Sequence, residues 1–154
     1  MLIRRKTGAG EDAAIVAAVD VGTIDMTGPV ARHYSEQVWI RLDMDAESVA
    51  HSLSAFTDGV NNLGAGIKVW VGTASSYAEP AAPDEHYNPP LLNGVPMANL
   101  FGYTASAPLW LDRQPVEQTP GDIGLYLVLV AEATTAASTS LHVGDDLTLA
   151  WNAS

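Results

Sequence analysis

The sequence predicts a mainly β protein, and three observations support this fold class. Several segments alternate apolar and polar side chains with the period of two that is typical of a half-buried strand. The chain has 154 residues with 13 glycines and nine prolines, which break it into short segments separated by turns. Predicted strands and helices do not alternate along the chain, as they would in a protein with a parallel sheet. We therefore expect an antiparallel β-sandwich or barrel.

The clearest predicted strand covers residues 123–134. Leu125, Leu127 and Leu129 lie on one face, and Tyr126 and Val128 lie on the other. Because both faces are apolar, we expect this strand at the centre of a sheet and covered on both sides. Shorter segments of the same kind predict strands at 35–43, 67–72, 100–104, 109–112, 141–143 and 147–151.

One short helix is expected at residues 46–58. Asp45 can cap its N-terminus, and Val49, Leu53 and Phe56 are spaced as one apolar stripe. Residues 13–24 fit either a short helix or an extended segment, because glycine and threonine interrupt their apolar pattern.

A long loop is expected at residues 75–96, which contain five prolines. Proline removes backbone donors, and this density of it excludes a central strand. Loops of this length without secondary structure are uncommon in compact domains, and they are often functional or lie at an interface.

The composition limits the classes of function. The chain has no cysteine, which excludes disulfides, thiolate metal sites and thiol catalysis. Its formal net charge of −11 argues against a nucleic-acid partner, because phosphates would be repelled. No apolar stretch has the length needed to span a bilayer, and acidic residues bracket the apolar residues 13–19, unlike in a secretory signal. We expect a soluble protein without a membrane partner, made and used inside a cell.

The N-terminus differs in charge from the rest of the chain. Arg4, Arg5 and Lys6 supply three of its seven cations. We therefore divide the chain into a basic N-terminal arm, residues 1–12, and a single domain, residues 13–154. The arm is either a solubilising, disordered start or a segment that docks on an acidic neighbour of the same or another chain.

Three tryptophans share one local pattern. Trp39, Trp70 and Trp110 each stand between two aliphatic residues of a predicted strand. Neighbouring side chains alternate across a strand, so each tryptophan faces away from its aliphatic neighbours. If the aliphatic residues form the core, the tryptophans lie on outer faces and mark an oligomer or partner interface. The alternative is that a loop, in particular the proline-rich one, buries one or two of them.

No group of residues predicts a reaction or a metal site. Residues 43–47 have a carboxylate at every second position but are not followed by the glycine and the later glutamate of a calcium-binding loop. Residues 84–86 could offer metal ligands, but no partner ligands can be identified elsewhere in the sequence. His51, Ser52 and Asp58 do not form a catalytic triad, because there is no nucleophile elbow. We expect no enzyme activity, no metal and no cofactor.

Together these features resemble tailed-phage capsid decoration (cement) proteins of the jelly-roll kind. The resemblance rests on the small, acidic, cysteine-free chain, the basic start at residues 1–10, the Ala/Gly/Thr-rich stretch to residue 27 and the closing strands. It implies a homotrimer on the capsid surface of the virion that bridges neighbouring major capsid proteins after synthesis in the host cytoplasm. The cations of the arm would then dock on the capsid, and the three tryptophans would pack in the interfaces.

A second hypothesis is a carbohydrate- or receptor-binding β-sandwich module of a phage tail or fibre. Tyr77, Tyr87 and Trp110 could then form a platform for sugar rings. A small β-barrel enzyme ranks third, because no acid–base group supports it.

Overall fold

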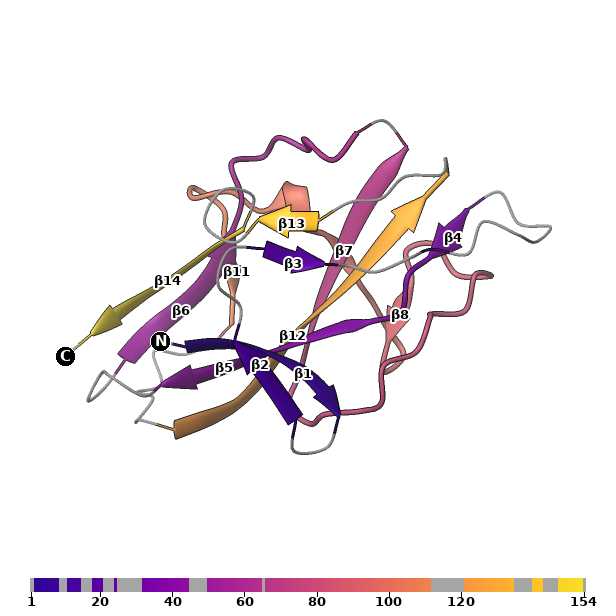
Figure 1. The fold of residues 1–154 in the computed structure, drawn as a ribbon. Coiled ribbons are helices and arrows are strands. Elements are labelled where there is room, and N and C mark those ends of the chain that lie inside the picture. The colour runs from indigo at the N-terminus through magenta and orange to yellow at the C-terminus, as the bar shows by residue number, and fades with distance from the viewer. Residues whose placement is uncertain are drawn as a thin grey trace.

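The computed structural model of the protein describes residues 2–8, 11–14, 18–20, 24, 32–44, 50–64, 66–111, 121–134, 140–142 and 147–153 (Figure 1). Over these residues the chain is built of strands, and every pair of named strands is antiparallel. The described residues contain no α-helix and one 3-10 turn, η1 (Leu100–Gly102). The prediction of a mainly β protein is confirmed.

The larger sheet has seven strands with β12 (Gly121–Ala133) inside it. On one side β12 pairs with β7 (Ile67–Ala74), and on the other with β5 (Val38–Met44) and, near its end, β4 (His33–Tyr34). The sheet continues from β7 to β10 (Ala98–Asn99), and from β5 to β1 (Leu2–Gly8) and β2 (Glu11–Ala14). In Figure 1, β12 is the long orange strand that crosses the molecule beside β7.

Three smaller sheets complete the described fold. A three-stranded sheet has the order β11 (Leu109–Trp110), β6 (Ala50–Phe56), β14 (Thr148–Ala153). Two strand pairs are formed by β13 (Ser140–His142) with β3 (Ala18–Asp20) and by β8 (Leu91–Leu92) with β9 (Val95–Pro96).

The large sheet has a hydrophobic core on each of its faces. Leu127 and Leu129 contribute to a core that also contains Ala55 of β6 and Leu147 beside β14, so this core lies between the large and the three-stranded sheet. The second core is on the other face, and its members from the sheet and from residues 75–97 are Tyr34, Trp39, Ala74, Tyr126, Val128, Val130, Leu92 and Met97. The expectation that β12 is covered on both sides is confirmed.

The predicted helix at residues 46–58 is wrong where the structure describes it. Residues 50–56 form β6, which pairs with β11 on one edge and β14 on the other. The apolar spacing also fits a strand, because Leu53 and Ala55 share one face and both are 1% exposed. Pairing on both edges decides the conformation, since strand formation depends on neighbours that a local pattern does not contain. Residues 46–49 of the predicted helix lie outside the described residues.

Two further local predictions are resolved by the structure. Residues 100–104 were expected to form a strand, but residues 100–102 form η1, capped by the Asn99 side chain, which accepts a hydrogen bond from the Phe101 N–H at 3.1 Å. Between residues 13 and 24, the extended alternative holds at residues 13–14 and 18–20.

The proline-rich segment is a long loop that ends in a short hairpin, β8–β9. Asn93 and Gly94, with φ of 50° and 77°, occupy the two turn positions between the strands. Positive φ at both positions matches the twist of a two-residue hairpin, which favours Asn-Gly. Leu92 and Met97 from this region then reach the second core and cover one face of the large sheet.

We predict that Trp39→Ala destabilises the fold by about 3–5 kcal/mol, because it opens a cavity in a close-packed core. Trp39 is 1% exposed, and its ring meets those of Tyr77 and Tyr126 edge-on at 5.5 and 5.7 Å. Urea unfolding measures the difference. Val60→Ala is the matched control: that side chain is 52% exposed, and its truncation is expected to cost less than about 0.5 kcal/mol. Equal costs at the two positions would contradict this assignment.

Candidate functional site

The predicted basic arm is part of the large sheet over residues 2–8. These residues form β1, which pairs with β5 and β2, and the backbones of Arg4 and Arg5 stand opposite Arg41 and Ile40. Lys6 is 9% exposed, and its Nζ lies 5.3 Å from the centre of the Tyr77 ring. Lys6 is therefore a buried residue whose ammonium group makes a cation–π contact with Tyr77. Met1 and residues 9–10 of the arm lie outside the described residues.

The three singled-out tryptophans have three different environments. Trp39 is fully buried in the second core, Trp70 is half-buried and packs against the same core, and Trp110 is exposed. The proline-rich segment covers Trp39 through Tyr77, as the alternative interpretation of the tryptophans expects. Trp110 is paired with Ser54 of β6, whereas its neighbour Leu109 is paired with Ala55 of the first core. Trp110 therefore lies on the outer face of the three-stranded sheet.

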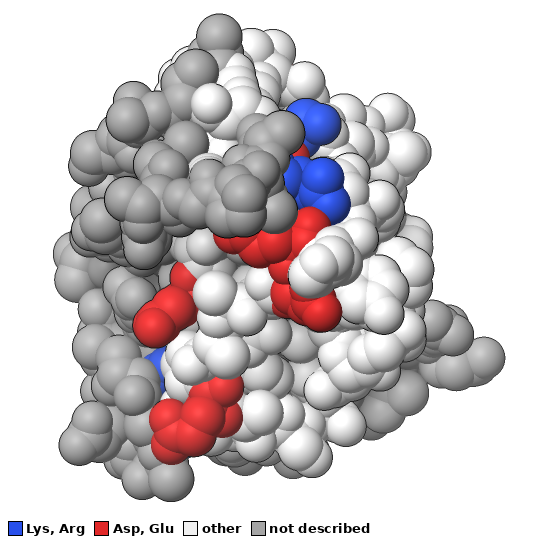
Figure 2. Space-filling view, turned by 90° about the vertical axis from the view of Figure 1, so that its right-hand side faces the viewer, with Lys and Arg blue, Asp and Glu red and all other residues white. Residues whose placement is uncertain are grey.

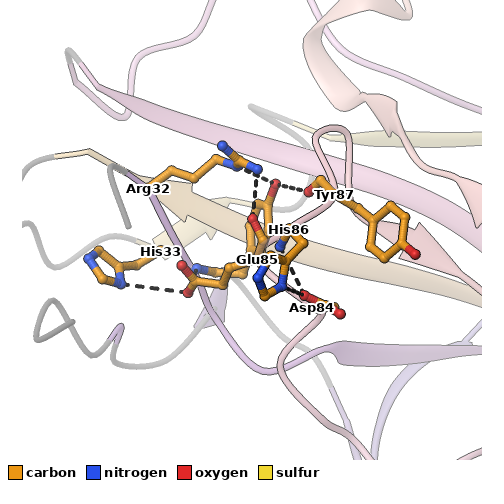
Figure 3. Close-up of polar contacts among 7 residues, drawn as sticks. Arg32, His33, Asp84, Glu85, His86 and Tyr87 are labelled. Carbon is orange, nitrogen blue, oxygen red and sulfur yellow. Dashed lines mark hydrogen bonds and ion pairs between the residues drawn. The ribbon is translucent and has the colours of Figure 1, made fainter. Parts of the chain in front are cut away.

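A polar cluster fixes residues 84–88 of the proline-rich loop to the edge of the sheet at β4. Figure 3 shows Arg32 and His33 directed at Glu85 of the loop. The Arg32 Nη2 donates to the Glu85 carbonyl oxygen at 2.6 Å, and the backbone N–H of Tyr34 donates to the Glu85 carboxylate at 3.2 Å. The buried His33 places its Nδ1 3.6 Å from the same carboxylate. Both the backbone and the side chain of Glu85 are thus bound to one strand.

The hydroxyl of Tyr34 is the second attachment point. It donates to the Tyr87 carbonyl oxygen at 2.7 Å and accepts from Arg32 Nε and Asn88 Nδ2, each at 3.1 Å. One donor and two acceptor positions are all that a hydroxyl offers, so its hydrogen-bonding capacity is fully used. Because Tyr34 is 4% exposed, water does not compete with these partners for its hydrogen bonds.

The third attachment point is a carboxylate inside the sheet. Glu132 of β12 is 4% exposed, and it accepts from the Trp70 indole N–H at 2.7 Å and from the loop's Asn88 amide at 3.2 Å. A buried carboxylate without donors would be strongly destabilising. Glu132 thus binds the half-buried tryptophan and the loop at once.

The outer surface of this loop is acidic and carries an exposed aromatic ring. Glu79 and Asp84 are exposed, Glu85 is half-buried, and Tyr87 is 50% exposed. Figure 2, which views the molecule from the side of β4 and β8, shows acidic side chains over this face and a smaller group of basic ones. The pKa of Asp84 lies below its ordinary value, because the His86 backbone N–H and then the His86 ring donate to the carboxylate.

A groove lined by both polar and apolar residues lies beside the loop and includes part of β7. Its volume is about 370 Å³, and its walls include Thr73 of β7, Leu92 and Val95 of the hairpin, and Leu109 of β11. Val95 is 63% exposed at its rim. Leu92 is buried and Leu109 is half-buried, so Val95 is the exposed large apolar side chain of this groove.

The described part of the chain contains no group of three or more histidine, aspartate or glutamate side chains placed to hold a metal ion. No helix in that part is long and apolar enough to cross a membrane. Comparisons of the chain with models of known protein families, with curated proteins and with solved structures give no match.

The sequence contained one indication of the network that our reasoning missed. Glu132 interrupts the apolar residues 126–133 of β12, and an acid in a strand covered on both sides requires buried donors. The identities of those donors, Trp70 and Asn88, could not be predicted, because they are 62 and 44 positions away along the chain.

We predict that Tyr34→Phe loosens the loop. The change removes one buried hydroxyl and keeps the ring, at a cost of about 1–2 kcal/mol, because the Tyr87 carbonyl loses a donor and Arg32 Nε loses an acceptor, whereas the Asn88 amide keeps Glu132. Hydrogen exchange of residues 84–88 and proteolysis within 75–97 should both become faster. Tyr87→Phe is the matched control, since its hydroxyl belongs to an exposed side chain. Equal loop protection in both variants would show that the hydroxyl does not hold the loop.

We predict that His86→Ala raises the pKa of Asp84 toward the ordinary 3.8 without reaching it. The backbone N–H of residue 86 still donates, whereas the ring contact at 2.7 Å is lost. Since the folded pKa is the lowered one, the turn gains stability above the ordinary pKa and loses it as pH falls through the lowered value. A carboxyl-carbon NMR titration measures the change, and an unaltered pKa would exclude a role for the ring.

Proposed function

We propose that this chain is a structural virion protein that binds the outside of a phage capsid and bridges neighbouring capsid subunits. The observation that carries the proposal is the combination of a sheet braced on both faces with apolar side chains left exposed at its surface. Val95 and Trp110 are 63% and 54% exposed, although the cores beside them are closed. Such residues favour a protein that acts by contact, with no reaction and no cofactor.

The bracing suits a protein that must resist deformation between its attachment points. The large sheet has a core on each face, and three hydrogen-bonded attachments hold the loop over one of them. We infer that the large and three-stranded sheets form a β-sandwich of the jelly-roll kind, because the first core draws residues from both.

The proposed assembly is a homotrimer on the capsid surface of the virion, bound to the major capsid protein. Trp110 is the candidate for packing between copies, because it is exposed on the outer face of the three-stranded sheet. Trp39 is buried and Trp70 is half-buried, so both would support the contact between copies only indirectly, through the packing of the core. Arg4 and Arg5 are the candidate docking residues, with Lys6 fixed in the sheet beside them.

A carbohydrate- or receptor-binding module of a phage tail or fibre is the second candidate. The observation in its favour is Tyr87, whose ring is 50% exposed while its backbone carbonyl is held by Tyr34. An exposed ring on a backbone that is already held can stack on a sugar face with less entropic cost than a ring on a free loop. Tyr77 contributes less to such a platform, because its ring packs on Trp39 and Tyr126.

We predict that the purified protein has a solution mass near three times 16.2 kDa by light scattering and that it co-sediments with expanded capsids of its own phage. Trp110→Ala should lower the solution mass toward that of one chain, because it removes the largest exposed apolar side chain of the proposed contact while leaving the fold intact. Tyr87→Ala is the control and should leave both the mass and the capsid binding unchanged.

A monomer that fails to bind these capsids would contradict the virion proposal. If that monomer instead binds glycans in a saturable way, and Tyr87→Ala abolishes the binding, the tail or fibre module becomes the better description.

A further inference from the structure

The tip of the β8–β9 hairpin carries an Asn-Gly pair. Asn93 and Gly94 fill the two turn positions, and both are exposed. Of the asparagines in the sequence, Asn93 alone is followed by glycine. The backbone nitrogen of the residue after an asparagine can attack the side-chain amide, and a following glycine has no side chain to obstruct that approach. The turn therefore brings together the two groups that spontaneous deamidation requires.

Both reacting groups are accessible in this turn. Within the described residues, no hydrogen bond involves the Asn93 side-chain amide or the Gly94 N–H. A Cβ placed on Gly94 would have no atom within 4 Å, so the tip stands in open space. Ring closure requires rotation about the Asn93 backbone. The hairpin opposes this weakly, because it has two residue pairs and one of them contains Pro96, which has no N–H to donate.

The residues on either side of the tip belong to the second core. Leu92 is 6% exposed and Met97 is 3% exposed. A Cβ on Gly72 would lie 2.8 Å from Leu92 Cδ2, so Leu92 packs directly on β7. The Met97 N–H donates to the Pro90 carbonyl oxygen at 2.9 Å. Because Leu92 and Met97 flank the same hairpin, the conformation of its turn decides whether both can reach the core.

We propose that Asn93 is a self-modification site whose product loosens the hairpin from the second core. The Gly94 nitrogen loses its proton to water and bonds to Asn93 Cγ, while the Cγ–Nδ2 bond breaks and the nitrogen leaves as ammonia, which takes up a proton. Water then opens the resulting succinimide. Opening at the backbone carbonyl leaves isoaspartate, with the main chain running through Cγ, and opening at Cγ leaves aspartate. The reaction consumes water and involves no change of oxidation state.

The isoaspartate product alters the hairpin in two ways. It adds a methylene to the main chain at a turn whose geometry suits two residues with positive φ, so Leu92 and Met97 cannot both keep their positions. It also places a carboxylate on the groove that Asn93 lines, where none of the described lining residues carries a charge. The inference goes beyond the proposed function, because it requires no partner.

The test uses the full chain, aged in mildly alkaline buffer and analysed by peptide mapping with electron-transfer fragmentation, which distinguishes isoaspartate from aspartate. Asn62 is the matched internal control, since it is also exposed but is followed by Leu63. We expect Asn93 to react at least about tenfold faster than Asn62, because glycine leaves the attacking nitrogen unobstructed. The reaction should slow in mildly acidic buffer, where that nitrogen keeps its proton. Equal rates at the two asparagines overturn the proposed site.

The loosening of the hairpin has a separate readout. Hydrogen exchange of the Met97 N–H should become faster as the isoaspartate fraction grows. Asn93→Gly is the matched control, because Gly-Gly also suits this turn and has no amide to react, so its exchange should not change on ageing. Isoaspartate at position 93 with unchanged exchange at Met97 overturns the loosening. Equal acceleration in aged Asn93→Gly also overturns it, since the cause would then lie elsewhere.

Discussion

The apolar character of β12 on both faces is the constraint on which the rest of the fold depends. A strand with Leu127 and Leu129 on one side and Tyr126 and Val128 on the other cannot lie on a surface, because either exposed face would leave large apolar area in water. One side is closed by the three-stranded sheet. The other is closed by the proline-rich segment with its short β8–β9 hairpin, which makes this segment a structural layer.

Polar contacts hold the middle of the loop, because the loop side chains that join the second core, Tyr77, Leu92 and Met97, lie toward its two ends. Leu92 and Met97 enter the core, but residues 84–88 are attached by Tyr34, Glu85 and Glu132. Buried polar groups cost free energy without their partners, so the hydrogen bonds of Tyr34 and Glu132 favour the one loop conformation in which they form. The polar network therefore fixes the surface that Tyr87 and Asp84 present.

Sequence reasoning predicted the features of this fold that depend on neighbouring residues in the chain. The alternation in residues 123–134 predicted that β12 is a central strand covered on both faces, and the prolines predicted the long loop. The helix prediction failed at residues 50–56, because pairing with β11 and β14 is not visible in the spacing of Leu53 and Phe56. Of the candidate interface residues, only Trp110 stayed exposed, since the burial of Trp39 depends on Tyr77, which comes from the distant loop.

The position of β12 in the chain has a consequence for folding during synthesis. β5 and β7 pair with β12 and not with each other, so the sheet stays in two parts, β5 with β1 and β7 with β10, until residues 121–133 have left the ribosome. Until then their apolar faces and open edges are available to other nascent chains, as is common for proteins dominated by contacts distant in sequence. The central strand completes the sheet late, and the first core is complete only when Leu147 and β14 follow it. Production of the intact protein should therefore benefit from slow translation and from chaperones more than its modest size suggests.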